Sequence, residues 1–406
     1  MEEVDDPHYL KRVTSLGDTR RVVTNQDIFS KTGIKLATIG SRINSSFHDR
    51  LARHKLMPPL DQCMTVEDAL TVDFLLAQAK RIFASEARFS AMEKLVDIEN
   101  IWSAISSINL NNSLAFKLTV AREMRPVLLD HSLRIALISL YLGLRCRLPE
   151  KALIELATAA VFHDLGELHI DPDILEKSND LTMLERRHIY AHPMVAYVIL
   201  KDFPEYHPAI STTVLQHHEC LDGSGYPAGI SNIAFTAQIL GMAEVVSGIA
   251  NRHKLEIVLK LNKHKLNTDL IGYVIGLFRS EQSQSSPGKG IAEIEKKLVQ
   301  LAKAFDEWDR IKQRGNPLFT FADHRIFELR QALFDAGFNP LELDRLTRGI
   351  EDDPESLHDV HTLVDESFWQ IKNLEREMNR LPDYGKATEM EKSILKEWIT
   401  RSSMEH

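Results

Sequence analysis

Metal-binding side chains recur at regular intervals in the middle of this 406-residue chain. The gaps between successive groups of them are 32, 28, 25 and 26 residues. Each gap is about the length of a helical hairpin, so consecutive helices could bring one or two ligands each to a single point inside a bundle. The predicted ligands are His131, His163, Asp164, His192, His217, His218 and Glu244.

These residue types suit a site with two metal ions. Neutral imidazoles bind divalent cations, and a carboxylate that bridges two ions offsets their charge and holds them about 3.5 to 4 Å apart. A water between the ions loses a proton readily, and the resulting hydroxide can attack phosphorus in line. Asp164 is the predicted bridge because it directly follows His163 at the end of an apolar helical run, residues 159–162.

Two longer motifs join these ligands. Residues 163–167 read His-Asp-Leu-Gly-Glu, and residues 217–227 read His-His-Glu-Cys-Leu-Asp-Gly-Ser-Gly-Tyr-Pro. About a third of the chain therefore resembles the HD-GYP family of phosphohydrolases, whose motifs are HDxGK and HHExxDGxGYP. The resemblance implies an all-helical domain, two divalent ions that are Fe or Mn, and hydrolysis of cyclic di-GMP.

The resemblance also implies roles for single residues. Asp164 and Glu167 stand at the catalytic positions, and Glu244 stands where the family usually has Asp. The expected substrate contacts comprise part of the signature loop and two basic residues near the family's phosphate-binding positions. They are Gly225, Tyr226, Pro227, Arg252 and Lys254.

Two positions depart from the family pattern. Val127 replaces a Glu ligand of three-metal members, and Glu167 replaces the motif lysine. Exchanging +1 for −1 about 6 Å from a phosphate is worth roughly 5 kcal/mol at an effective dielectric near 20. Glu167 could instead act as an additional carboxylate ligand, or it could be a solvated or hydrogen-bonded glutamate.

Three functions follow as hypotheses. The first is a metal-dependent phosphodiesterase that hydrolyses cyclic di-GMP through a metal-bridging hydroxide. The second is a catalytically impaired signalling or interaction protein that binds metal, messenger or protein partners of the signalling network without turnover. The third is an HD hydrolase with another nucleotide substrate.

The surrounding elements favour an all-α fold with an HD-type helical bundle in the middle. We expect an N-terminal flanking unit over residues 1–115, with a small hairpin from runs 21–23 and 34–37 followed by helices. The metal-binding domain should cover residues 116–255. A helical C-terminal region over 256–406 should contain a mobile loop near 280–290, where the sequence is polar and low in complexity.

Near the C-terminus, apolar residues step by three and four, which predicts one helical stripe. Packing on the body of the protein is favoured over a homodimer seam, which stays an alternative. The stripe comprises Val364, Phe368, Ile371, Leu374, Met378 and Leu381.

Composition sets outer limits. A net charge of −9 argues against binding of duplex DNA over a broad surface, although a small anion needs only a local positive site. The start lacks a secretory pattern and the apolar runs are too short for a bilayer, so no membrane association is expected. Three widely spaced cysteines, Cys63, Cys146 and Cys220, predict neither disulfides nor a zinc site, which favours the cytoplasm.

Overall fold

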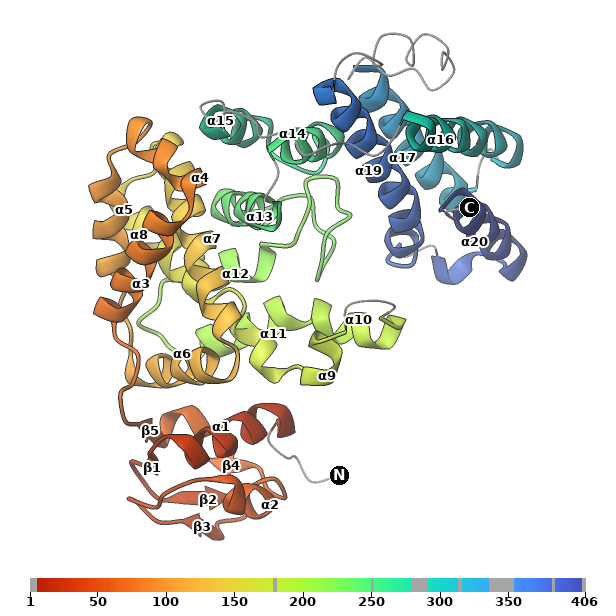
Figure 1. Cartoon of the computed structure of the whole chain (residues 1–406). Helices are drawn as coiled ribbons and strands as arrows, with labels where there is room; N and C mark the ends of the chain where they lie inside the picture. The colour runs from red at the N-terminus through yellow and green to blue at the C-terminus, as the bar shows by residue number, and fades with distance from the viewer. Residues whose placement is uncertain are drawn as a thin grey trace. The chain divides into compact units, whose positions relative to one another are not determined.

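The computed structural model describes residues 6–177, 181–249, 252–278, 291–312, 316–335, 354–381 and 384–403. Within these ranges the chain divides into two compact units (Figure 1). Unit 1 lies within Met1–Cys220, Gly225–Gly248 and Gly272–Phe278, and unit 2 lies within Leu221–Ser224, Ile249–Ile271 and Arg279–His406. The loop predicted near 280–290 falls outside the described residues.

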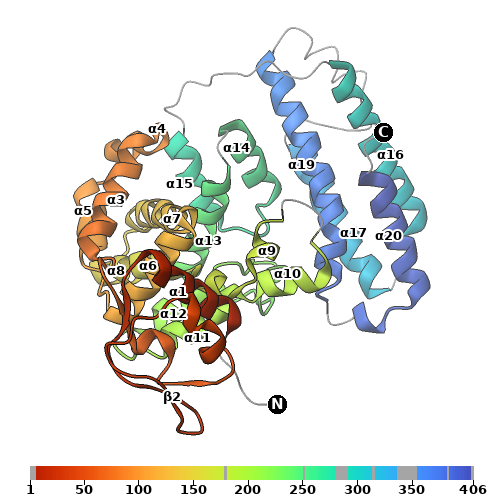
Figure 2. The ribbon, with the colours of Figure 1, turned by 60° about the horizontal axis from the view of Figure 1, so that its bottom comes forward.

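Unit 1 opens with helix α1 (Pro7–Thr19), which the sequence analysis did not predict. The Asp6 carboxylate caps it by accepting the backbone N–H groups of His8 and Tyr9. Helix α1 packs against α6 (Asn112–Met124), as Figure 2 shows, and also against the short helix η4 (Leu165–His169). Five short strands follow: β1 (Val22–Thr24), β2 (Ile28–Ser30), β3 (Lys35–Ala37), β4 (Leu56–Met57) and β5 (Met64–Val66).

The predicted pairing of the first hairpin is wrong. Lys35–Ala37 pairs with Ile28–Ser30 and not with Val22–Thr24, because Gly33, at φ +85°, allows a tight turn directly after Ser30. Val22–Thr24 instead pairs antiparallel with Met64–Val66. The result is a two-stranded sheet, β1-β5, and a three-stranded sheet, β3-β2-β4.

The rest of unit 1 is helical, which confirms the predicted all-α bundle with a small α+β N-terminal unit. The first group of helices is η1 (Ser45–Phe47), α2 (His48–Leu51), η2 (Leu60–Gln62), α3 (Val72–Ser85), α4 (Ala87–Ser90), η3 (Ala91–Lys94), α5 (Ile98–Ser106) and α6 (Asn112–Met124). The second group is α7 (Pro126–Arg145), α8 (Glu150–Phe162), η4 (Leu165–His169), α9 (Pro172–Leu175), α10 (Met183–Tyr190), α11 (His192–Lys201), α12 (Pro208–Gln216) and α13 (Phe235–Gly248).

Helix α7 is the core helix of this bundle. It packs against α3, α6, α8 and α13, and Leu133, Leu137 and Leu140 are fully buried. Its length and composition alone would also suit a membrane span, but 72% of its most apolar window is buried inside the protein. The residues that face neighbouring helices therefore account for its apolar character.

Unit 2 has its own apolar core, which contains Trp308, Phe319 and Trp398. The predicted C-terminal stripe is confirmed as packing within this unit, since Val364 and Ile371 are fully buried. The helices of unit 2 are α14 (Arg252–Leu261), α16 (Ile291–Ile311), α17 (Pro317–Asp335), α19 (Pro354–Met378), η5 (Tyr384–Lys386) and α20 (Glu389–Ser403). Most of α15 (Thr268–Phe278) belongs to unit 1.

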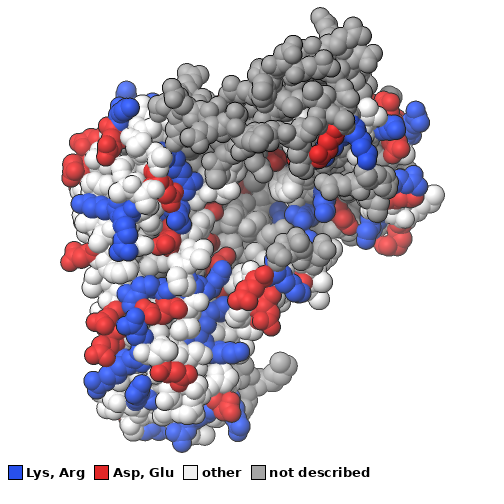
Figure 3. Space-filling model, in the orientation of Figure 1, with Lys and Arg blue, Asp and Glu red and all other residues white. Residues whose placement is uncertain are grey.

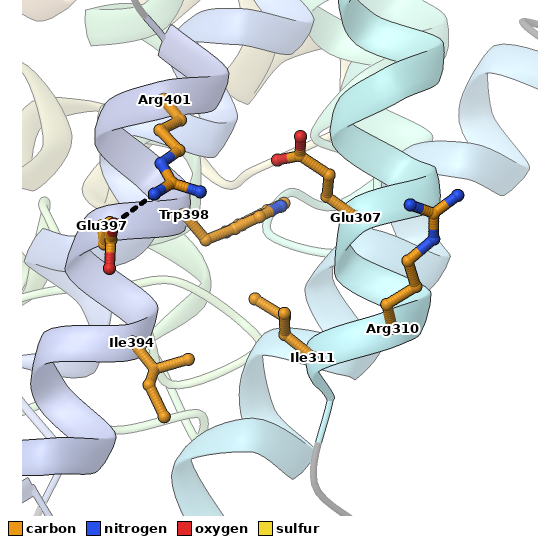
Figure 4. A pocket seen from close by; sticks show the side chains of 7 residues that line it. All are labelled: Glu307, Arg310, Ile311, Ile394, Glu397, Trp398 and Arg401. Carbon is orange, nitrogen blue, oxygen red and sulfur yellow. Dashed lines mark hydrogen bonds and ion pairs between the residues drawn. The ribbon is translucent and has the colours of Figure 1, made fainter.

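A pocket of about 440 Å³ lies between α16 and α20 of unit 2 (Figure 4). Two isoleucines and the ring of Trp398 supply its apolar part, and an Arg401–Glu397 ion pair lies at one side. None of its lining residues is a predicted metal ligand. The lining residues are Glu307, Arg310, Ile311, Ile394, Glu397, Trp398 and Arg401.

Charged side chains of both signs are interspersed on the face of unit 1 seen in Figure 3. The expectation of no broad contact with duplex DNA stays a prediction.

Candidate metal centre

Five of the seven predicted ligands lie at helix ends in unit 1. His163 and Asp164 directly follow α8, His192 is the first residue of α11, and His217 and His218 directly follow α12. Two ligands lie within longer helices, His131 in α7 and Glu244 in α13. Helix ends allow side chains from different directions to reach one point, and the structure brings all seven residues together.

Three imidazoles are oriented in the same way. The Nδ1 atoms of His163, His192 and His217 each lie 2.6 to 2.8 Å from the backbone oxygen of the residue three positions earlier. A carbonyl oxygen can only accept, so Nδ1 carries a proton, and the neutral form of each imidazole presents its lone pair at Nε2. This hydrogen bond fixes the tautomer that a metal ligand needs.

The two oxygens of Asp164 face different groups. Oδ1 lies 3.2 Å from His192 Nε2 and 3.9 Å from His217 Nε2. Oδ2 lies 3.0 Å from His163 Nε2 and 3.7 Å from His131 Nε2. A carboxylate in this position can bind one cation with each oxygen, as the sequence predicted for Asp164.

Two sets of four ligand atoms therefore share Asp164, and within each set all atoms lie within 4.8 Å of one another. Glu244 belongs to the second set, and its Oε1 atom lies 2.7 Å from His163 Nε2 and 3.2 Å from His131 Nε2. Imidazole and carboxylate donors suit Fe, Mn or Zn. The residues fit two divalent cations. The sets are Asp164, His192, His217 and His218, and His131, His163, Asp164 and Glu244.

Electrostatics of the cluster favour cations. Burial would lower the pKa of His163, but the negative charges of Asp164 and Glu244 raise it well above its ordinary value. Burial would raise the pKa of Asp164, yet His163 and His192 hold it well below the usual range. Burial and the neighbouring histidines lower the pKa of His218 to about 3. Burial would also raise the pKa of Glu244, but His163 and His131 hold it well below the usual range. Both carboxylates are thus charged and His218 is neutral at pH 7, the states in which these groups bind cations.

Metal affinity should depend on pH because His163 must lose its proton to bind a cation. Its pKa lies above the ordinary histidine value, so the affinity of the metal-free protein for Mn²⁺ should fall as pH drops through that raised pKa. Calorimetric titration between about pH 6 and 9 should show tighter binding and less proton release at the higher pH. If the affinity for Mn²⁺ stayed the same over this pH range, the assignment of His163 as a metal ligand would be contradicted.

The signature loop packs against the ligands. The Tyr226 ring stacks on the His218 ring with centroids 4.5 Å apart, and the Tyr226 backbone N–H donates to the His218 carbonyl oxygen at 3.0 Å. A Cβ on Gly225 would lie 2.4 Å from the Cys220 backbone nitrogen, which explains the glycine there. Glu219 accepts the backbone N–H groups of residues 228–230. The loop is thus held beside His218.

Glu167 lies outside both sets of ligand atoms among the described residues. Its Oε2 atom accepts a hydrogen bond from Arg125 Nη1 at 2.5 Å, which favours the hydrogen-bonded alternative over a further metal ligand. Val127 is 78% exposed at the start of α7. The prediction for Arg252 and Lys254 concerns side chains outside the described residues, although both belong to α14.

Sequence reasoning missed Arg125 and Arg12. The Arg12 guanidinium is buried and donates to the carbonyl oxygens of Leu168 and Ile170, directly after Glu167. Neither arginine belongs to a motif or a regular spacing, and no sequence signal pairs residues so far apart. Only the packing of α1 and η4 reveals these contacts.

Comparisons with known proteins agree with this site. The family model described as HD domain matches residues 110–247, which contain every proposed metal ligand. This segment is therefore an HD domain. Within the HD domains, the segment matches the HD-GYP family in both of its motifs, residues 163–167 and 217–227.

Three curated relatives are named as phosphodiesterases. The chain is 35% identical over 121 residues to a cyclic di-GMP phosphodiesterase of Borreliella burgdorferi, covering 29% of this chain and 32% of the relative. It is 24% identical over 184 residues to a cyclic di-GMP phosphodiesterase of Pseudomonas aeruginosa, covering 44% of each. A 3'3'-cGAMP-specific phosphodiesterase of Vibrio cholerae is 26% identical over 140 residues, covering 34% of this chain and 30% of the relative.

The chain thus spans less than half the length of each of these relatives. A solved HD-GYP-type protein from Bdellovibrio bacteriovorus matches 64% of this chain and 95% of its own, at 13% identity and a TM-score of 0.36.

Proposed function

We propose that this chain is a metal-dependent phosphodiesterase that hydrolyses cyclic di-GMP or a related cyclic dinucleotide. The position of Asp164 carries the proposal, because its two oxygens face two separate sets of imidazole and carboxylate donors. The relatives named as cyclic di-GMP and 3'3'-cGAMP phosphodiesterases support the substrate class.

The chain's own residues would prepare the site. Asp164 would hold both cations, with neutral His217 and His218 completing one set and Glu244 completing the other. The bound cations would supply an activated water and stabilise charge on the phosphate oxygens. The carbonyl bonds to the Nδ1 atoms keep the imidazoles in place before substrate binds, which limits reorganisation during the reaction. Tyr226 would line the site beside His218.

Turnover by the full chain tests this proposal. Protein purified without oxygen and loaded with Fe²⁺ or Mn²⁺ should convert cyclic di-GMP or 3'3'-cGAMP to the linear dinucleotide or mononucleotides, detected by chromatography. The chelated protein is the control and should release neither product. Absence of turnover of both substrates at two bound metals per chain would refute the activity.

One observation favours a second function, a protein that binds the messenger or a partner without turnover. Glu167 places a carboxylate where the resembling motif has lysine, and this carboxylate pairs with Arg125. A Glu167→Lys variant that gains activity absent from the parent would support this alternative, whereas full activity of the parent would remove it. Protein partners, a homodimer and a cytoplasmic location remain proposals under either function.

A further inference from the structure

The Arg125–Glu167 pair joins two segments that carry metal ligands. Arg125 directly precedes α7, which contains His131, and Glu167 lies in η4, three residues after Asp164. Both side chains are shielded, with exposed fractions of 29% for Arg125 and 18% for Glu167. A charged pair sheltered from water keeps its geometry better than an exposed pair, so Glu167 restrains the Arg125 guanidinium.

The pair lies close to the metal centre. Burial and the negative charge of Asp164 raise the pKa of Glu167, while the charges of Arg125 and His192 oppose that rise. The geometry agrees: a Cβ on Gly166, directly before Glu167, would lie 2.1 Å from the His192 carbonyl oxygen, so the segment that carries Glu167 lies against His192. Through Glu167, Arg125 is held at the edge of the site.

Arg12 supports the same segment from the side of α1. Its two guanidinium contacts are the carbonyl oxygens of Leu168 and Ile170, at the end of η4. Arg12 and Arg125 thus bind neighbouring residues of one segment, 167–170. The donors of Arg12 are thus directed at the backbone, and its contribution is to hold η4 in place.

Arg125 differs from Arg12 in how its donors are used. A guanidinium has five N–H donors in a planar fork. Within the described part of the chain, the side chain of Arg125 has one hydrogen-bond partner, Glu167, which takes a bond from Nη1. The remaining donors are available to a ligand, and the fork matches two oxygens of a phosphate.

We propose that Arg125 binds a phosphate group of the substrate at the edge of the metal centre, with Glu167 as the positioning residue that holds its guanidinium. The inference rests on the proposed function for the statement that the substrate carries a phosphodiester. It gives Glu167 a role that is neither that of a metal ligand nor that of a lost lysine. A negative side chain at position 167 is then compatible with an anionic substrate, because it orients a cation.

The test measures binding of inorganic phosphate to the Mn²⁺-loaded full chain by calorimetry. We expect Arg125→Gln to raise the dissociation constant at least about tenfold, since one charged hydrogen-bonding contact is lost. Arg125→Lys should raise it less, because the charge stays and the fork is lost. Arg122→Gln is the matched control, because Arg122 lies three residues earlier and pairs with Glu123. It should bind phosphate as the parent does.

Manganese content is measured on every variant, so a loss of metal is not mistaken for a loss of phosphate. If Arg125→Gln fails to hold manganese, Arg125→Lys decides: weaker phosphate binding at parental metal content supports the proposal, and unchanged binding overturns it. Parental phosphate affinity in Arg125→Gln, or a parent that binds no phosphate, also overturns it.

Glu167→Gln tests the positioning role. This variant keeps the Arg125 guanidinium but weakens its interaction with residue 167. Phosphate affinity should therefore fall by a smaller factor than in Arg125→Gln, with metal content unchanged. Parental phosphate affinity in Glu167→Gln would overturn the positioning role of Glu167. Phosphate binding that depends on Arg125 in a chain without cyclic dinucleotide turnover would refute the proposed function and leave this inference standing. Turnover of a cyclic dinucleotide, together with phosphate binding that does not depend on Arg125, would support the proposed function and refute this inference.

Discussion

A chain with Asn in place of Asp164 should bind fewer than two cations and lose phosphodiester hydrolysis. Asn has nearly the same shape, but it lacks the negative charge and turns one of the two oxygens into an NH₂ donor. Since Oδ1 and Oδ2 face different sets of ligands, one set loses its shared oxygen whichever way the amide is turned. Changes to residues that only support a ligand already cost about 10- to 100-fold in affinity or activity, so this bridging position should cost more.

Metal analysis of the purified variant, followed by turnover at saturating Mn²⁺, measures this effect. Asp173→Asn is the matched control, because Asp173 is an exposed aspartate at the start of α9 and belongs to neither set of ligands. It should keep parental metal content. Two metals per chain in Asp164→Asn would contradict the bridging role. Retention of one metal would show that the two sets bind independently.

That these seven side chains meet at one point could be predicted from sequence, because few residue types bind cations and their spacing matches helical hairpins. The spacing could not predict which way each imidazole or carboxylate group points. The carbonyl bonds to the Nδ1 atoms of His163, His192 and His217 follow from the geometry of the helix ends at which these residues lie. Which set of ligands each oxygen of Asp164 faces likewise depends on how α7, α8 and α13 pack.

The N-terminal part was predicted less well. Helix α1 has a legible signal, since Asp6-Pro7 can begin a helix and Leu10, Val13 and Leu16 form one buried face. The strands are only two or three residues long, and such short runs contain too few alternating positions to choose a partner. Contacts between distant segments, such as Arg12 with η4, depend on packing alone. The division at residue 115 remains a sequence-based prediction, although Arg12 ties the N-terminal part to the site.

A methyl group on Gly166 should disrupt the metal centre from within. Gly166 lies between Asp164 and Glu167 in sequence, and a Cβ there would lie 2.1 Å from the His192 carbonyl oxygen and 2.8 Å from the His192 Cα. The obstructing atoms are backbone, so no side-chain rotation can relieve the contact. Either η4 or the start of α11 must move. Asp164 directly precedes η4, and His192 is the first residue of α11, so either movement displaces a predicted ligand.

We therefore expect Gly166→Ala to lower the free energy of unfolding by about 1 to 3 kcal/mol, as overpacked cores do, and to weaken metal binding as well. Thermal unfolding with and without Mn²⁺ measures both effects, because a ligand stabilises the folded state according to its affinity. Gly248→Ala is the control: Gly248 ends α13, the helix of Glu244, and a Cβ there meets no atom within 4 Å among the described residues. Alanine favours helices, so this variant should be as stable as the parent or more so. If Gly166→Ala keeps the parental stabilisation by Mn²⁺, then η4 and α11 do not need this close contact to hold Asp164 and His192 at one site.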